Sequence, residues 1–326
     1  MPIDEGLLNA AWTALRDCLL LQPRETVLIL TDESRAPIGR ALLQAARELG
    51  AQACYVEMPV MDRDGQEPPA PIAELMKGFQ AVVAATERSL THTNARREAC
   101  KAGARVATMP GIQEDTMIRC LAADYFAIAA RTEKLTQLLN RGSQVHVTAS
   151  GGTDLRFSIQ GVEAISSTGL IHKPGTFGNL PSGESYMRPL EGTADGVLVV
   201  DGSMAGVGNL IELEEIIQIE IRQGKAVRIT GGNAAGCLEA LLAPVGPDAY
   251  TMAEFGVGTN DAARIIGNIL EDEKVMSTIH VAFGNNVSMG GQVNVPIHLD
   301  GIVQYPSVEV DGVLVMKDGQ LFEDRL

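Results

Sequence analysis

The segment VPIHLDGIV places His298 and Asp300 two residues apart within an apolar run. Side chains at positions i and i+2 of a β-strand point to the same face. The two polar groups would therefore share a face that an ordinary core fills with apolar side chains. Neutral imidazole and carboxylate are both good ligands for zinc, manganese, cobalt or iron, so the pair indicates a divalent metal site.

Three other segments carry side chains of the same kinds. Glu184 lies in NLPSGESYMRP, where prolines and a glycine predict a rigid, irregular loop, and a solvated loop glutamate is the plain alternative. Glu254 lies among small and apolar residues in MAEFGVGTN, where an unpaired buried carboxylate would be costly. His280 alternates with apolar residues in STIHVAFGNN, although a lone strand histidine is more often structural. Together the five side chains suit one or two first-row divalent ions.

The elements that must position these side chains change in character along the chain. Up to residue 140, short aliphatic runs such as ETVLIL alternate with helical patterns such as APIGRALLQAARELG. This alternation predicts an α/β domain with a parallel sheet at residues 1–140. Strand-like runs separated by glycine-rich turns then predominate, with helices predicted at 233–245 and 261–274. We predict a mainly β, α+β domain at residues 141–326 that holds the metal and the catalytic groups.

Composition argues against several classes of protein. The net charge of −15 disfavours binding to nucleic acid or to an anionic membrane surface. The five cysteines are odd in number and form no C-x-x-C pair, which predicts a reducing compartment. The N-terminus does not have the pattern of a signal peptide, and no run approaches the roughly 20 apolar residues of a membrane span. We therefore expect a cytoplasmic protein.

The motifs NLPSGE, AEFGVGTN, ILEDEKVMSTIHVAFG and IHLDG occur in the order found in the aminopeptidase T/S family of metallopeptidases. The segments SLTHTNARREACKAGARVATMPGI and GTDLRFSI are also similar, so the resemblance covers nearly the whole chain. In that family, a two-metal site hydrolyses the N-terminal peptide bond. The resemblance implies a homodimer that acts on a short peptide or another small molecule. It also implies a set of metal ligands, which are Glu184, Glu254, His280, His298 and Asp300.

One position departs from the pattern of the peptidases. They have a tyrosine ligand seven residues after the strand histidine, where this chain has Val287. A shorter branch of the superfamily contains 2,5-dihydroxypyridine 5,6-dioxygenase, an iron(II) enzyme that cleaves an aromatic ring. Two histidines and one carboxylate, here His280, His298 and Asp300, are the ligand set of mononuclear non-haem iron oxygenases. The loss of a tyrosine ligand fits one metal ion better than two.

The sequence leaves three functions open. We predict first a hydrolase like aminopeptidase T/S, in which zinc, cobalt or manganese activates a water molecule. The alternative is an iron(II) dioxygenase that opens a hydroxylated pyridine, and the third is a non-catalytic, metal-stabilised binding protein. Glu184 and Glu254 are expected to serve in catalysis as well as in metal binding. Tyr186 would replace the missing phenol or orient the substrate, and His172 would act as an acid, a base or an anion-binding group.

Overall fold

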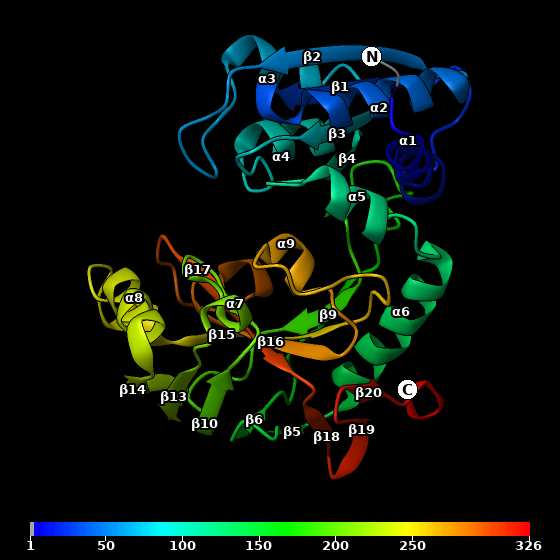
Figure 1. Cartoon of the computed structure of the whole chain (residues 1–326). Coiled ribbons are helices and arrows are strands. Elements are labelled where there is room, and N and C mark those ends of the chain that lie inside the picture. Colours follow the sequence, from blue (N-terminus) through cyan, green and yellow to red (C-terminus); the bar gives the residue numbers. More distant parts are fainter. Residues whose placement is uncertain (1–2) are drawn as a thin grey trace. The chain divides into compact units, whose positions relative to one another are not determined.

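The computed structural model describes residues 3–326, which form two compact units (Figure 1). The first unit comprises the chain up to Ala129 together with Thr168–Ser182. The second unit comprises Ala130–Ser167 and Gly183–Leu326. The chain therefore passes between the units three times, whereas the sequence prediction placed a single boundary at residue 140.

The first unit is built on a five-stranded sheet in which every neighbouring pair is parallel. Its strands, in spatial order, are β2 (Gln52–Met58), β1 (Thr26–Asp32), β3 (Ala81–Ala85), β4 (Arg105–Thr108) and β8 (Phe177–Asn179). Its helices are α1 (Glu5–Trp12), η1 (Thr13–Cys18), η2 (Glu33–Arg35), α2 (Ala36–Glu48), α3 (Ala70–Met76), α4 (Asn94–Lys101) and α5 (Glu114–Cys120). The central strand β3 is buried along its whole length, as expected for an aliphatic run in a covered parallel sheet.

The second unit contains two antiparallel sheets. The eight-stranded sheet has the order β14 (Lys225–Thr230), β13 (Ile217–Arg222), β10 (Asp195–Val200), β6 (Asp154–Ser158), β5 (Gln144–Thr148), β18 (Ser307–Val310), β19 (Val313–Lys317) and β20 (Gln320–Leu321). The seven-stranded sheet has the order β12 (Gly208–Asn209), β11 (Ser203–Met204), β17 (His298–Gln304), β16 (Thr278–Gly284), β15 (Met252–Gly258), β9 (Glu184–Met187) and β7 (Ile165–Ser167). A mixed α/β protein with one parallel sheet and antiparallel sheets is thus confirmed.

One apolar cluster joins the two antiparallel sheets. Phe157 of β6 and Phe255 of β15 are both buried, and their ring centroids lie 5.0 Å apart. Side chains of α6 (Tyr125–Arg141) and α8 (Gly232–Leu242) complete the cluster. The remaining helices of the unit are α7 (Leu210–Leu213), η3 (Pro247–Tyr250), α9 (Ile269–Asp272), η4 (Val287–Met289) and η5 (Glu323–Arg325).

Two local predictions are wrong. The helix expected at 261–274 is reduced to α9, because Gly267 has a positive φ of 82° and the carboxylate of Asp272 accepts hydrogen bonds from the amides of Ile266 and Gly267. These bonds hold the preceding segment as a loop instead of a helix. The irregular loop expected around Glu184 is in part the strand β9, which pairs with β15 and β7.

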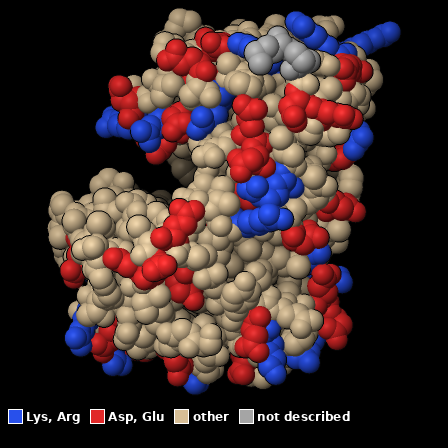
Figure 2. All heavy atoms as spheres, viewed as in Figure 1, with Lys and Arg blue, Asp and Glu red and all other residues tan. Residues whose placement is uncertain are grey.

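Every helix of residues 3–326 is too short or too polar to cross a bilayer. Figure 2 shows one face of the molecule, on which acidic and basic side chains are interspersed. This is the usual distribution of charge on a solvated surface.

We expect Phe157→Ala to lower the free energy of unfolding by about 3–5 kcal/mol, because the deleted ring leaves a cavity against Phe255. Val313→Ala is a suitable control, since Val313 is 53% exposed and its truncation should change that free energy by about 0.5 kcal/mol or less. Urea denaturation at a fixed metal concentration measures both changes. Equal effects of the two substitutions would contradict a shared core between the sheets.

Candidate metal centre

Strand register gathers the predicted ligands on one face of the seven-stranded sheet. Glu254 of β15 pairs with Ala282 of β16, which in turn pairs with Asp300 of β17. The neighbouring row on the same face pairs Gly256 with His280. Paired residues of antiparallel strands point to the same side, so three adjacent strands contribute side chains to one region.

The small residues of these rows provide the space for the large polar ones. A Cβ atom at position 256 would lie only 2.0 Å from Nε2 of His280. The imidazole of His280 therefore lies directly over Gly256, where no other residue type fits without displacing it. The imidazole is thus the group that approaches the backbone of β15 at this glycine.

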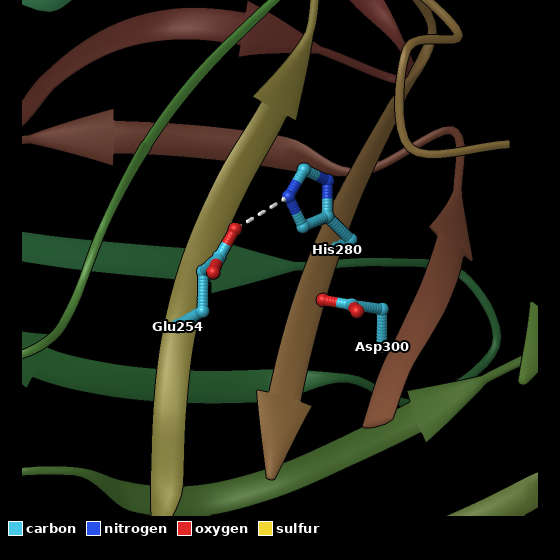
Figure 3. A group of neighbouring side chains, drawn as sticks. All are labelled: Glu254, His280 and Asp300. Carbon is cyan, nitrogen blue, oxygen red and sulfur yellow. Dashed lines mark hydrogen bonds and ion pairs between the residues drawn. The ribbon is translucent and has the colours of Figure 1, made fainter. Parts of the chain in front are cut away.

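Glu254, His280 and Asp300 form the centre of the site (Figure 3). All three are buried, and each offers a ligand atom within 4.8 Å of those of the other two. Nε2 of His280 lies 3.2 Å from Oε1 of Glu254 and 3.6 Å from Oε2 of Glu184. In Figure 3 the side chains of Glu254 and His280 point toward each other from adjacent strands, and Asp300 lies beside them on the next strand.

His298 completes the cluster at its more accessible side. Its Nε2 lies 3.2 Å from Oε2 of Glu254 and 3.4 Å from Oδ1 of Asp300, and its side chain is 32% exposed. Its Nδ1 lies 2.7 Å from the carbonyl oxygen of Asn285, which can only accept, so Nδ1 carries a proton and donates it. Metal-bound histidines commonly hold their second nitrogen in this way, leaving Nε2 free as a ligand.

The charges of the cluster are suited to a bound cation. Burial alone would lower the pKa of His280, but the hydrogen bond to Glu254 and the charges of Glu184 and Glu254 outweigh it and raise that pKa to about 9. Burial likewise opposes ionisation of Asp300, yet the nearby imidazoles hold its pKa below the usual range. Oε2 of Glu184 and Oδ1 of Asp300 have no hydrogen-bond partner among residues 3–326. These nitrogen and oxygen donors fit a divalent first-row ion. The bound ion would replace the protons of the imidazoles as the source of positive charge beside the carboxylates.

Sequence reasoning missed Lys274, which lies just after α9. Its side chain is 1% exposed, and its Nζ lies 2.8 Å from Oε1 of Glu184 and 2.6 Å from Oε2 of Glu273. Burial raises the pKa of Glu273 to about 8, with the charges of Asp300 and Glu184 adding to the shift. In the sequence ILEDEK, a lysine among acidic residues is typical of a surface helix, so no local signal indicated its burial.

The other predicted residues are placed as follows. Tyr186 shares the site-facing side of β9 with Glu184 and pairs with Gly256, and burial with the charges of Glu184 and Glu254 raises its pKa. Val287 begins η4 and is 48% exposed. His172 belongs to the first unit, where its Nε2 bonds to the carbonyl of Asp17, so its catalytic role stays a prediction.

Comparison with known proteins decides the family. The sequence model of the 2,5-dihydroxypyridine 5,6-dioxygenase family matches residues 7–323. The chain belongs to this family. It is 24% identical, over 354 aligned positions, to 2,5-dihydroxypyridine 5,6-dioxygenase of Pseudomonas putida KT2440, covering 98% of this chain and 97% of that protein.

Two solved structures share the fold. The structure of 2,5-dihydroxypyridine dioxygenase from P. putida KT2440 superposes with a TM-score of 0.83 at 21% identity, covering 98% of both chains. Wild-type AmpT from Thermus thermophilus gives a TM-score of 0.69 at 17% identity, covering 98% of this chain and 100% of its own. The predicted resemblance to the aminopeptidase T/S superfamily, including its dioxygenase branch, is confirmed.

The first functional prediction is wrong. Both the family and the curated relative are dioxygenases, so an aminopeptidase-like hydrolase is not the function that the comparisons support. The dioxygenase family supports the prediction of an enzyme, and the ligand cluster supports that of a bound divalent metal. The predicted homodimer stays a prediction.

Gly256→Ala should weaken metal binding at least about tenfold, because the new Cβ displaces the imidazole of His280. Gly236→Ala is the matched control: Gly236 lies within α8 with open space around its Cβ position, so this substitution should leave metal binding unchanged. Equilibrium dialysis against Mn²⁺, with circular dichroism to check the fold, measures both. Equal affinities in the two variants would show that His280 does not depend on the glycine.

Proposed function

We propose that this chain is an iron(II)-dependent dioxygenase that opens the ring of a hydroxylated pyridine. The observation that carries the proposal is the convergence of His280, His298 and Asp300 from two adjacent strands. Two histidines and one carboxylate are the ligand set of non-haem iron oxygenases, which keep coordination positions open. The family and the name of the P. putida relative support the class of substrate.

The chain's own residues would divide the work as follows. His280, His298 and Asp300 would hold the iron, and Glu254 lies within 3.2 Å of Nε2 of both histidines, so its carboxylate would ligate the ion or keep the imidazoles in place. When bound, iron(II) would activate dioxygen by relaying electrons to it from the hydroxylated ring, which is the net reductant, and both oxygen atoms would enter the product. The backbone carbonyl of Asn285 would keep His298 in the tautomer whose Nε2 is a ligand.

Tyr186 would serve as a hydrogen-bond donor to the substrate. Its raised pKa keeps the phenol protonated at neutral pH, and its strand position beside Gly256 puts it on the face that holds the ligands. A neutral phenol can donate to an oxygen or a ring nitrogen of a hydroxypyridine. Glu184, which is bonded to Lys274, would orient this side of the site.

The direct test is oxygen uptake by the purified protein loaded anaerobically with iron(II) and supplied with 2,5-dihydroxypyridine. We expect uptake matched by loss of the substrate's ultraviolet absorbance. His280→Ala and Asp300→Ala should each lower the rate at least about 100-fold, because each removes a proposed ligand. An oxygen electrode and a spectrophotometer measure both signals.

His146→Ala is the control for these variants. His146 is a half-buried strand histidine of the same unit that bonds to Asp154 and lies outside the cluster. It should retain full uptake. The proposal fails if 2,5-dihydroxypyridine and related hydroxypyridines give no uptake with iron(II), or if His280→Ala keeps the full rate. If metal removal only lowers the melting temperature and no activity is found, a metal-stabilised binding protein is the better description.

Tyr186→Phe should retain the bound iron and lower kcat/KM about tenfold, the value of one neutral hydrogen bond of about 1.4 kcal/mol. The ring and its packing are kept, so the protein should unfold at nearly the same temperature. Iron content, the melting temperature and steady-state oxygen uptake measure the three properties. Loss of iron in this variant would show that Tyr186 acts on the metal site instead of the substrate.

A further inference from the structure

Lys274 reaches the metal centre because a glycine lets its backbone pass close to β15. A Cβ atom at Gly258 would lie 2.1 Å from the carbonyl oxygen of Val275. The amide of Asn260 also donates to the carbonyl of Lys274, at 2.8 Å. These contacts fix the segment beside the strand that carries Glu254, so the lysine is held by the sheet itself and not by a mobile surface loop.

The ammonium of Lys274 takes up one flank of the carboxylate cluster. Nζ lies 2.8 Å from Oε1 of Glu184 and 2.6 Å from Oε2 of Glu273, with almost no exposure to solvent. Glu184 turns only its second oxygen toward His280, at 3.6 Å. Burial disfavours the ionised form of these carboxyl groups, and the fixed ammonium of Lys274 offsets part of that cost.

We infer that Lys274 acts as a built-in second cation that limits the centre to one metal ion. Left without the ammonium, Glu184 and Glu273 would be two buried carboxyl groups beside a metal site. A further divalent ion could take their protons' place and use their oxygens as ligands. With the ammonium in place, the ion binds at Glu254, His280, His298 and Asp300, and Glu184 contacts the lysine. The inference rests on the proposed metal centre of the dioxygenase and names Lys274 as the residue that sets its metal count.

A single ion has a functional consequence for the proposed reaction. A second ion held by Glu184 and Glu273 would add a second Lewis acid to the site, and two-metal sites are suited to activating water for hydrolysis. An ammonium group donates hydrogen bonds but cannot coordinate a substrate oxygen. It therefore provides positive charge beside the carboxyl groups without acting as a second Lewis acid. Lys274 is thus a positioning residue and is not expected to touch the substrate.

The test is the metal stoichiometry of the full-length protein with Mn²⁺ as the probe. The wild-type protein should bind one ion per chain by equilibrium dialysis and elemental analysis. Lys274→Met, which keeps the length of the side chain and removes its charge, should bind two. Electron paramagnetic resonance should then show the signal of a coupled Mn²⁺ pair, which a merely structural role of the lysine would not produce.

Two variants serve as controls. Lys225→Met removes a lysine that is half-exposed and pairs with Asp248 on the surface, so it should still bind one ion. Lys274→Met/Glu184→Gln/Glu273→Gln removes the ammonium and both carboxyl groups together, so it should fold and bind one ion. Two ions in this variant would overturn the role assigned to the glutamates.

Two ions in the wild type, or one ion in Lys274→Met, would overturn the inference. If Lys274→Met folds poorly without metal, excess Mn²⁺ should raise its melting temperature more than it raises that of the wild type, and failure to fold in excess Mn²⁺ would contradict a replaceable cation. Because no step uses oxygen uptake, a wild type that binds one ion but is inactive on hydroxypyridines would refute the proposed function and leave the inference standing.

Discussion

The structure of the second unit depends on the balance of charge on one buried sheet face. Four carboxyl groups, those of Glu184, Glu254, Glu273 and Asp300, lie around two imidazoles and one ammonium. Such a group is costly in an apolar interior unless positive charge is close to each carboxylate. Lys274 supplies that charge at one flank, and the imidazoles direct their nitrogens at the other. A metal ion bound by the imidazoles and carboxylates would complete the balance.

Two glycines of one strand make this arrangement possible. Gly256 gives the imidazole of His280 its place, and Gly258 lets the backbone of Val275 approach. The imidazole and the backbone of Val275 both lie against β15. This strand also carries Glu254 and, on its opposite face, Phe255 in the core. One strand therefore links the stability of the unit to the geometry of the site.

A shared fold does not fix the reaction. The chain superposes on a dioxygenase with a TM-score of 0.83 and on AmpT with 0.69, at identities of 21% and 17% that speak for the fold alone. The reaction must therefore be argued from the side chains of the site. Here Val287 stands on an exposed helical turn, and a lysine pairs with the glutamate that the peptidase resemblance made a ligand. The peptidase resemblance extends along nearly the whole chain, but Val287 at the position of the tyrosine ligand agrees with the dioxygenase family.

The sequence by itself determined the parallel sheet of the first unit, the β-rich second unit and the five polar residues that converge. These features follow from local periodicity and from the unusual presence of histidine and carboxylates in apolar strands. The pairing of β9 with β15, the loop that replaces most of the helix expected at 261–274 and the burial of Lys274 were decided only by tertiary structure. The strand pairing and the burial of the lysine depend on partners distant along the chain: Glu184, for example, lies 90 residues from Lys274. The residues next to Lys274 in the sequence do not indicate such a distant partner. A lysine among acidic residues could therefore not be distinguished from a surface charge.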